Sequence, residues 1–451
     1  MDPVWLARLQ FSLTVMFHFL FPPISIGLGF LIFVLETARW RTGRDVYRRA
    51  SDLWIRIFAI NFAVGVATGI VMEFEFGTNW AGYSRFVGDI FGAPLAAEGI
   101  LAFFLESGFL GLLVFGRRRI SSFVRWLASA MVSLGTVLSA FWILVANSWM
   151  QTPAGYRIEG GRALMTDFGA AVLNPSTLPR LAHTLSAALC MGAFVMAGVS
   201  AWYARRGLHP SVARVCLRLG VVAAFTGAVL VFLTGDRHAR QVAHTQHAKF
   251  AAMEGIYSTE RGAPLILFSL PPTQHGPTPG PEIAVTQLTS FLAFGNFQAP
   301  IEGLKSFPFE EWPPVAVTFL AFHNMVIVAN LIALVALWGL VLLVRGRLET
   351  ARGWQALMMW SVPLPMIAIQ LGWLTAEVGR QPWIVYGVLR TADGVSKVVP
   401  APEILFSILL FSVVYLVLGA LWLFLILREI RRGPEPAEFS GTEAEASHAV
   451  A

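Results

Sequence analysis

The stretch FSLTVMFHFLFPPISIGLGFLIFVLE, residues 11–36, decides the fold class of this chain. It contains no Asp, Lys or Arg, and its first Glu is the last residue of the run. About 20 apolar residues in a row are enough to cross a bilayer as a helix. Similar runs recur along the 451 residues, of which 56% are hydrophobic. Because the runs are continuous and do not alternate, they predict an all-α, polytopic membrane helical bundle.

These runs predict about nine membrane-spanning helices. Their approximate bounds are 11–36, 53–76, 93–116, 123–147, 179–204, 213–235, 314–344, 355–378 and 402–428. Arginine clusters follow the first, third, fifth, seventh and ninth spans, whereas the other short loops are poor in Arg and Lys. By the positive-inside rule, this asymmetry predicts a periplasmic N-terminus and a cytoplasmic C-terminus in a bacterial inner membrane. The arginine clusters in the loops also account for the net charge of +6, so nucleic acid is not an expected partner.

The spans divide the chain into four regions. We expect six membrane helices within 1–235, a periplasmic loop over 236–313, three further helices within 314–432, and a disordered cytoplasmic tail over 433–451. A loop of this length in a compact protein is usually functional or disordered. The tail is acidic and contains Pro and Ala, as disordered ends often do.

Four side chains that are unusual in lipid lie in four different spans: His18, His183, Met325 and Glu377. When the spans are threaded through a bilayer, all four fall in its outer part. Imidazole and thioether groups hold haem iron in many proteins, and carboxylates also bind iron. Each residue has a structural alternative, because a histidine can join two helices by a hydrogen bond, a methionine can fill the core, and a terminal glutamate can reach water. Their convergence favours a redox protein.

Two further pairs of polar residues are candidates for proton chemistry. Glu98 and Glu106 lie on the third span, about 12 Å apart along its axis and about 80° apart around it. Both could border one internal proton path, although each could equally be satisfied by neighbouring polar groups. In the external loop, Lys249 and Glu254 could contact a quinol oxygen and accept its proton. The alternative for this pair is a charged amphipathic segment at the membrane surface.

Several motifs resemble one known family when they are read in order. They are RLQFSLTVMFHFLFPP at 8–23, INFAVGVATGIVMEFEFGTNW at 60–80, VGDIFGAPLAAEGILAFFLES at 87–107 and GWLTAEVGRQPW at 372–383. Together they make the chain similar, over nearly its whole length, to subunit I of cytochrome bd-type quinol oxidases.

The resemblance implies haem-binding roles for the polar residues in the spans. His183 and Met325 match the axial pair of a low-spin haem b. His18 and Glu377 match the ligands of two closely spaced high-spin haems, one haem b and one haem d, without showing which ligand serves which haem. Arg380, in the GRQPW motif, matches a residue near these haems.

The resemblance also implies an activity and partners. Glu98 and Glu106 match acids of the proton route, and Lys249 and Glu254 match the quinol-binding part of the loop. The implied reaction oxidises ubiquinol or menaquinol and reduces O₂ to water. Proton uptake and release on opposite sides would generate a proton motive force without pumping. The implied partners are a polytopic subunit II and a small single-span subunit.

Two departures from the family pattern affect these expectations. His323, in AFHNMVIVAN, stands where the family commonly has Arg, and it competes with Met325 as a ligand candidate. The loop after Glu254 is short and resembles the cyanide-insensitive branch, in which a further haem b can replace haem d. Two other functions stay open: a haem-binding sensor or scaffold without O₂ reduction, and an ion-coupled transporter. A transporter would be expected to show broken helices in repeated halves, and the sequence has no such repeat.

Overall fold

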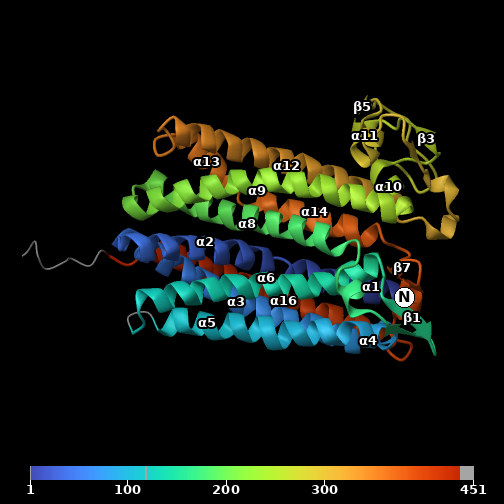
Figure 1. Cartoon of the computed structure of the whole chain (residues 1–451), viewed down its shortest axis with the longest axis horizontal. Coiled ribbons are helices and arrows are strands. Elements are labelled where there is room, and N and C mark those ends of the chain that lie inside the picture. Colours follow the sequence, from blue (N-terminus) through green and yellow to red (C-terminus); the bar gives the residue numbers. More distant parts are fainter. Residues whose placement is uncertain (1, 117–118, 437–451) are drawn as a thin grey trace, which may run out of the picture.

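The computed structural model describes residues 2–116 and 119–436 and shows a bundle of long helices that run side by side (Figure 1). Within these residues, nine helical segments are long and apolar enough to cross a membrane, which confirms the expected number. The segments are Pro3–Thr42, Asp45–Gly77, Ala81–Phe115, Ser122–Gln151, Phe168–Arg206, Pro210–Thr245, Val315–Val344, Arg352–Val378 and Ala401–Arg432. The all-α membrane bundle is therefore confirmed.

The first span is two helices joined by a sharp break. These are α1 (Pro3–His18) and α2 (Pro22–Thr42). The two prolines that open α2 lack the N–H group that a continuous helix needs, so the chain cannot pass through them as one helix. Asn61 of α3 donates a hydrogen bond of 2.9 Å to the carbonyl oxygen of Phe21, which also accepts from the backbone N–H of Ser25 at 3.0 Å. The break makes His18 the last residue of α1.

The third span also has an irregular centre. It consists of α4 (Ala81–Ala97), a π-helical stretch (Glu98–Phe103) and α5 (Phe104–Phe115). Pro94 lies inside α4, four residues before the irregular stretch begins. A proline removes one backbone donor of the helix, and π-helical turns inside α-helices are frequent at functional sites. The expected proton-path residue Glu98 opens this stretch.

The other long helices are more regular. They are α3 (Asp45–Gly77), α6 (Ser122–Gln151), α8 (Thr177–Arg206), α9 (Pro210–Thr245), α12 (Val315–Val344), α13 (Arg352–Ser361), α14 (Pro363–Val378) and α16 (Ala401–Arg432). Helix α8 packs against α2 and α9, and α12 packs against α9 and α14 (Figure 1). Helix α9 continues past residue 235, where we expected the external loop to begin, so the loop opens instead at Gln246.

The segment after α9 is folded and has its own small core. It contains α10 (His247–Glu254), α11 (Leu288–Phe294) and two antiparallel strand pairs, β3 (Glu260–Arg261) with β6 (Pro300–Ile301) and β4 (Leu265–Phe268) with β5 (Ile283–Val285). Phe250, Met253 and Ile256 are among its buried core residues. The N-terminus lies at the same end of the bundle as this segment (Figure 1).

Short elements complete the connections at that end. They are β1 (Tyr156–Glu159) paired with β2 (Arg162–Met165), α7 (Phe168–Val172), β7 (Trp383–Val385) paired with β8 (Leu389–Arg390), and α15 (Thr391–Gly394). Most of the expected acidic tail, residues 437–451, lies outside the described residues.

A buried ionic cluster joins three helices at the opposite end. Arg125 of α6 donates from Nε to Glu36 of α2 at 2.8 Å and also pairs with Asp52 of α3. All three side chains are almost fully buried. Removing one partner of such a cluster leaves an uncompensated buried charge, which is strongly unfavourable. The cluster therefore fixes how α2, α3 and α6 are arranged.

Candidate functional site

A large cavity of about 1350 Å³ runs between the helices. Pockets for a single small ligand usually measure roughly 300–1,000 Å³, so this cavity has room for more than one cofactor. Its lining includes every residue that the sequence predicted for the site. These residues are His18, Glu98, Glu106, His183, Lys249, Glu254, Met325, Glu377 and Arg380.

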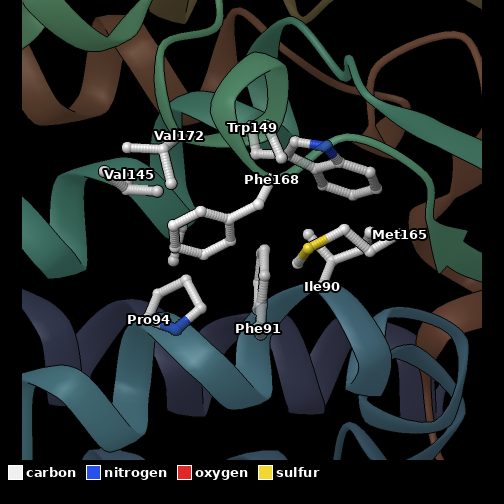
Figure 2. Close-up of a pocket in the computed structure, with 10 residues that line it drawn as sticks. Ile90, Phe91, Pro94, Val145, Trp149, Met165, Phe168 and Val172 are labelled. Atoms are coloured by element: carbon white, nitrogen blue, oxygen red, sulfur yellow. The ribbon is translucent and has the colours of Figure 1, made fainter.

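A second hollow is small and apolar. It measures about 10 Å³, and Figure 2 shows the rings of Phe91, Phe168 and Trp149 around it. The Trp149 indole nitrogen is already engaged, because it donates to the carbonyl oxygen of Ala154 at 2.9 Å. A void of this size barely holds one water molecule and needs polar partners to do so. This hollow has no room for a cofactor, so the large cavity is the candidate site.

The His18 side chain is held by a contact with α3, the adjacent helix. Its Nδ1 lies 3.0 Å from Oγ1 of Thr68, and that hydroxyl itself donates to the carbonyl oxygens of Val64 and Gly65 at 3.1 and 2.9 Å. Because the hydroxyl group donates its hydrogen to the backbone, its oxygen accepts a hydrogen bond from Nδ1–H of His18. This fixes the tautomer with Nε2 as the lone-pair nitrogen, which is the form that binds a metal.

His183 is held in the same way by a different helix. Its Nδ1 lies 3.2 Å from Oγ1 of Thr234, and Thr234 donates to the carbonyl oxygen of Leu230 at 2.6 Å. In both cases the residue after the threonine is glycine. A Cβ at Gly69 or at Gly235 would lie 3.1 Å from Cε1 of the corresponding histidine. The two candidate ligands thus share one support, a Thr-Gly pair on a neighbouring helix.

Met325 lies on α12 and faces α14. A Cβ added at Gly372 would come within 3.0 Å of the Met325 sulfur, so the glycine makes room for the thioether. The competing candidate His323 is engaged elsewhere, because its Nδ1 and Nε2 lie 3.0 and 3.1 Å from the carbonyl oxygens of Phe319 and Ile266. This geometry favours Met325 over His323 as the ligand candidate.

Glu377 is the last charged residue of α14 and is held by three donors. Asn147 and Gln151 of α6 donate to its Oε1 at 3.0 and 3.2 Å. Arg380 donates to its Oε2 at 2.5 Å. These contacts orient the carboxylate at the cavity wall, where it can serve as an oxygen ligand for iron.

Three of the ligand candidates lie at different distances from the start of their helices. Because α1 begins at Pro3, His18 is about 22 Å along its helix at 1.5 Å per residue. His183 is about 9 Å from the start of α8, and Met325 is about 15 Å from the start of α12. The sequence predicted a shared outer depth, with His18 about seven residues into its span. These distances are counted from helix ends, which can lie outside the bilayer, so the shared outer depth stays a prediction.

The acidic residues come together across three elements. Ser139 of α6 donates to Oε1 of Glu98 at 2.8 Å. Glu73 of α3 and Glu106 of α5 both interact electrostatically with Glu98. Glu106 is only 5% exposed and its Oε1 has no hydrogen-bond partner among the described residues. An acid path along this wall is consistent with the arrangement expected for Glu98 and Glu106.

Lys249 and Glu254 lie at the two ends of α10, and both are buried. The ammonium group of Lys249 donates to Gln151, to Gln246 and to the carbonyl oxygen of Ala376, at 2.9, 3.2 and 2.8 Å. Burial, followed by the charge of Arg180, lowers the pKa of Lys249 well below its ordinary value. With its three donors engaged, Lys249 fastens α10 to α14.

Glu254 is held by fewer hydrogen bonds than Lys249. It is 4% exposed, it lines the cavity, and its hydrogen bond from Thr289 is long at 3.5 Å. Burial raises the pKa of Glu254 to about 7. A carboxyl group with such a pKa can accept and release a proton near neutral pH.

Sequence reasoning missed several residues at the site. Thr68 and Thr234 looked like ordinary polar residues in apolar runs, and no pattern in the sequence assigned an individual role to Arg180, Asn147 or Ser139. One signal was available, because threonine is followed by glycine at both supports. The role of this threonine-glycine pair can be recognised only in the structure, where each pair lies next to a histidine.

The chain is similar to known proteins over nearly its whole length. Residues 6–434 match the family described as cytochrome bd terminal oxidase subunit I. Cytochrome bd ubiquinol oxidase subunit 1 of Bacillus subtilis is 41% identical, over 96% of this chain and 95% of its own. Cytochrome bd-II ubiquinol oxidase subunit 1 of Escherichia coli is 34% identical, over 96% and 97%.

A solved structure is also similar. The structure of bd oxidase from Geobacillus thermodenitrificans superimposes with a TM-score of 0.89 at 31% identity, covering 96% of this chain and 99% of the other. The sequence match and the structural match each extend over nearly the whole chain. The chain therefore belongs to the family of cytochrome bd terminal oxidase subunit I.

Proposed function

We propose that this chain is the haem-bearing subunit of a membrane oxidase that oxidises quinol and reduces O₂ to water. The observation that carries the proposal is the pair of cavity-lining histidines, His18 and His183, each with its Nδ1 held by a threonine. Metal-ligating histidines typically have their other ring nitrogen hydrogen-bonded in this way. A sensor or a transporter is less well supported, because the family and its named relatives are oxidases.

Haem is the cofactor of this family, and the residues present fit it. The cavity is large, and both histidines have the metal-binding tautomer. His183 and Met325 would hold a low-spin haem b, and a haem held by a His/Met pair would supply electron transfer. His18 and Glu377 would each hold one high-spin haem, a haem b and either a haem d or a further haem b. When bound, the haems supply the electron transfer and the oxygen chemistry.

The protein's own groups would handle the protons and the quinol. Glu254 is placed to accept a quinol proton, and Lys249 holds α10 in position beside the cavity. Glu98 and Glu106, which also line the cavity, would carry protons toward the site of O₂ reduction. With a periplasmic N-terminus, quinol protons would be released outward and the protons for water taken from the cytoplasm. Charge would then cross the membrane without a pump.

The proposed partners are a polytopic subunit II, a small single-span subunit, and ubiquinol or menaquinol as the electron donor. Helix α16 presents a strongly apolar outer face, with Phe406, Leu416 and Phe424 exposed by 68%, 75% and 61%. Such a face needs lipid or another membrane protein to cover it.

The test is a reduced-minus-oxidised visible spectrum of the purified complex, with haem quantified as the pyridine haemochrome and O₂ uptake measured with quinol. We expect haem bands and quinol-dependent O₂ uptake. We expect His183→Ala to remove the low-spin b signal while the other bands persist, because His183 would be a ligand of that haem alone.

His275→Ala is the matched control, since His275 lies in the external segment and stacks on Phe309 outside the cavity. A wild-type complex without haem bands would refute the oxidase and favour a transporter. A low-spin b signal without any reaction with O₂ or CO would favour a sensor. An unchanged spectrum in His183→Ala would refute the ligand assignment alone.

A further inference from the structure

His323 connects the external segment to α12. Its Nε2 lies 3.1 Å from the carbonyl oxygen of Ile266 in β4, and its ring stacks on that of Phe319 with centroids 3.9 Å apart. A carbonyl oxygen only accepts hydrogen bonds, so the bond to Ile266 places a hydrogen on Nε2. The register of the β4–β5 pair shifts between Ile266 and Phe268. The histidine therefore holds β4 at a point where its pairing with β5 is irregular.

Phe319 also supports the end of α10. Gly255, directly after Glu254, has a φ of +70°, and a Cβ added there would lie 3.2 Å from Cε2 of Phe319. Glycine adopts this backbone conformation without strain and leaves room for the ring. The Phe319 side chain is buried at 3% exposure. One ring thus packs against both His323 and the residue that follows Glu254.

A third contact ties β4 to the surroundings of Glu254. Thr289 of α11 donates to the carbonyl oxygen of Pro264, the residue before β4, at 2.9 Å. The same hydroxyl oxygen lies 3.5 Å from Oε2 of Glu254. Thr289 and His323 therefore fasten β4 at two carbonyl groups, those of Pro264 and Ile266, and the first of them lies next to the Glu254 carboxyl group.

The strand that is held in this way forms part of the cavity wall. The cavity lining includes Leu265, Ile266 and Leu267 together with Glu254 and His323. A quinol ring that reaches Glu254 would therefore pack against β4. A wall that is loose before the ring binds must be ordered on binding, and this ordering lowers the affinity.

We infer that His323 is a positioning residue for quinol, because it holds β4 in the shape against which the ring packs beside Glu254. This inference rests on the proposed function, since it requires that quinol give its proton to Glu254. His323 acts through β4 and needs no contact with the reacting atoms. Its role is therefore separate from that of Met325, two residues further along α12.

The experiment compares His323→Phe and His323→Gln in the purified complex. Phenylalanine keeps a ring on Phe319 but cannot donate to Ile266, whereas the amide nitrogen of glutamine can take the place of Nε2. We expect His323→Phe to raise the quinol KM about fivefold, the equivalent of one neutral hydrogen bond, at unchanged kcat. We expect His323→Gln to keep the KM near its wild-type value.

Hydrogen exchange of the backbone amides of residues 265–268 is a second readout that does not depend on turnover. Exchange should be faster in His323→Phe than in the wild type or in His323→Gln, because β4 opens more readily once its hydrogen bond is lost. The low-spin haem band should be the same in all three proteins, since the ligand Met325 is retained.

His275→Phe is the matched control, because His275 also stacks on a phenylalanine, Phe309, in the external segment but does not line the cavity. An unchanged quinol KM in His323→Phe, or an equal rise in His275→Phe, would overturn the inference. A rise in KM that comes with an altered low-spin band would place the effect on Met325 and would also overturn it. Wild-type complex without haem, or without quinol-dependent O₂ uptake, would instead refute the proposed function.

Discussion

Replacing Thr234 with valine tests the support behind His183 most directly. Valine keeps the shape of threonine but has no hydroxyl, so Nδ1 of His183 loses its acceptor at 3.2 Å. A neutral hydrogen bond of this kind is worth about 1 kcal/mol. The bond makes the imidazole a stronger electron donor to iron, and a stronger donor stabilises the oxidised state. Its loss should therefore raise the midpoint potential of the low-spin haem.

The expected shift of the midpoint potential follows from the free energy of the same hydrogen bond. A tenfold change in a one-electron equilibrium is 59 mV, so about 1 kcal/mol corresponds to roughly 40 mV. The assay is a spectroscopic redox titration of the low-spin band in Thr234→Val, with haem content measured in parallel. Thr68→Val is the matched control, because it removes the equivalent bond from His18 at 3.0 Å and should leave the low-spin band unchanged. A low-spin midpoint that stays at its wild-type value in Thr234→Val, or that shifts equally in both variants, would refute the reasoning.

Three further outcomes are expected. Gly69→Ala should weaken binding of the haem at His18 and spare the low-spin band, because the added Cβ would lie 3.1 Å from Cε1 of the imidazole; the visible spectrum reports both. Glu106→Gln should slow O₂ reduction at least tenfold at unchanged haem content, since a positioned proton donor contributes about 10²–10⁴-fold. Burial raises the pKa of Glu254 to about 7, so this carboxyl is protonated below that pH and ionised above it. Quinol oxidation should rise as pH increases through about 7, and Glu254→Gln should remove that rise.

Each of these outcomes has a clear opposite. Loss of every haem in Gly69→Ala would indicate general misfolding instead of a local clash. Wild-type turnover in Glu106→Gln would exclude this residue from the proton route. A pH profile that keeps its limb near 7 in Glu254→Gln would assign the titration to another group.

Much of the fold was predictable because the bilayer imposes a simple rule on sequence. A spanning helix must be apolar for about 20 residues, so the runs located all nine spans. They did not locate the helix ends well, since α1 begins at Pro3 and α9 continues to Thr245. A helix can extend beyond the apolar run that marks it, and hydropathy does not report that extension.

The site was predictable in part for a related reason. A histidine or a glutamate in lipid needs a partner, so His18, His183 and Glu377 stood out, and all three line one cavity. The partners did not stand out, because Thr68 and Thr234 lie about 50 residues from the histidines they contact. Contacts across that distance depend on how helices pack, which no local pattern encodes. The roles of all these residues remain predictions.

The recurrence of threonine followed by glycine behind two separate histidines has a use in protein design. A designed bundle that carries a porphyrin must hold its coordinating side chain in one orientation. Here a neighbouring helix sets the orientation of each histidine ring. The threonine hydroxyl holds the ring by a hydrogen bond, and the glycine beside it leaves space for the ring. Grafting that dipeptide onto the facing segment of an artificial bundle would test whether two residues are enough to set the ring.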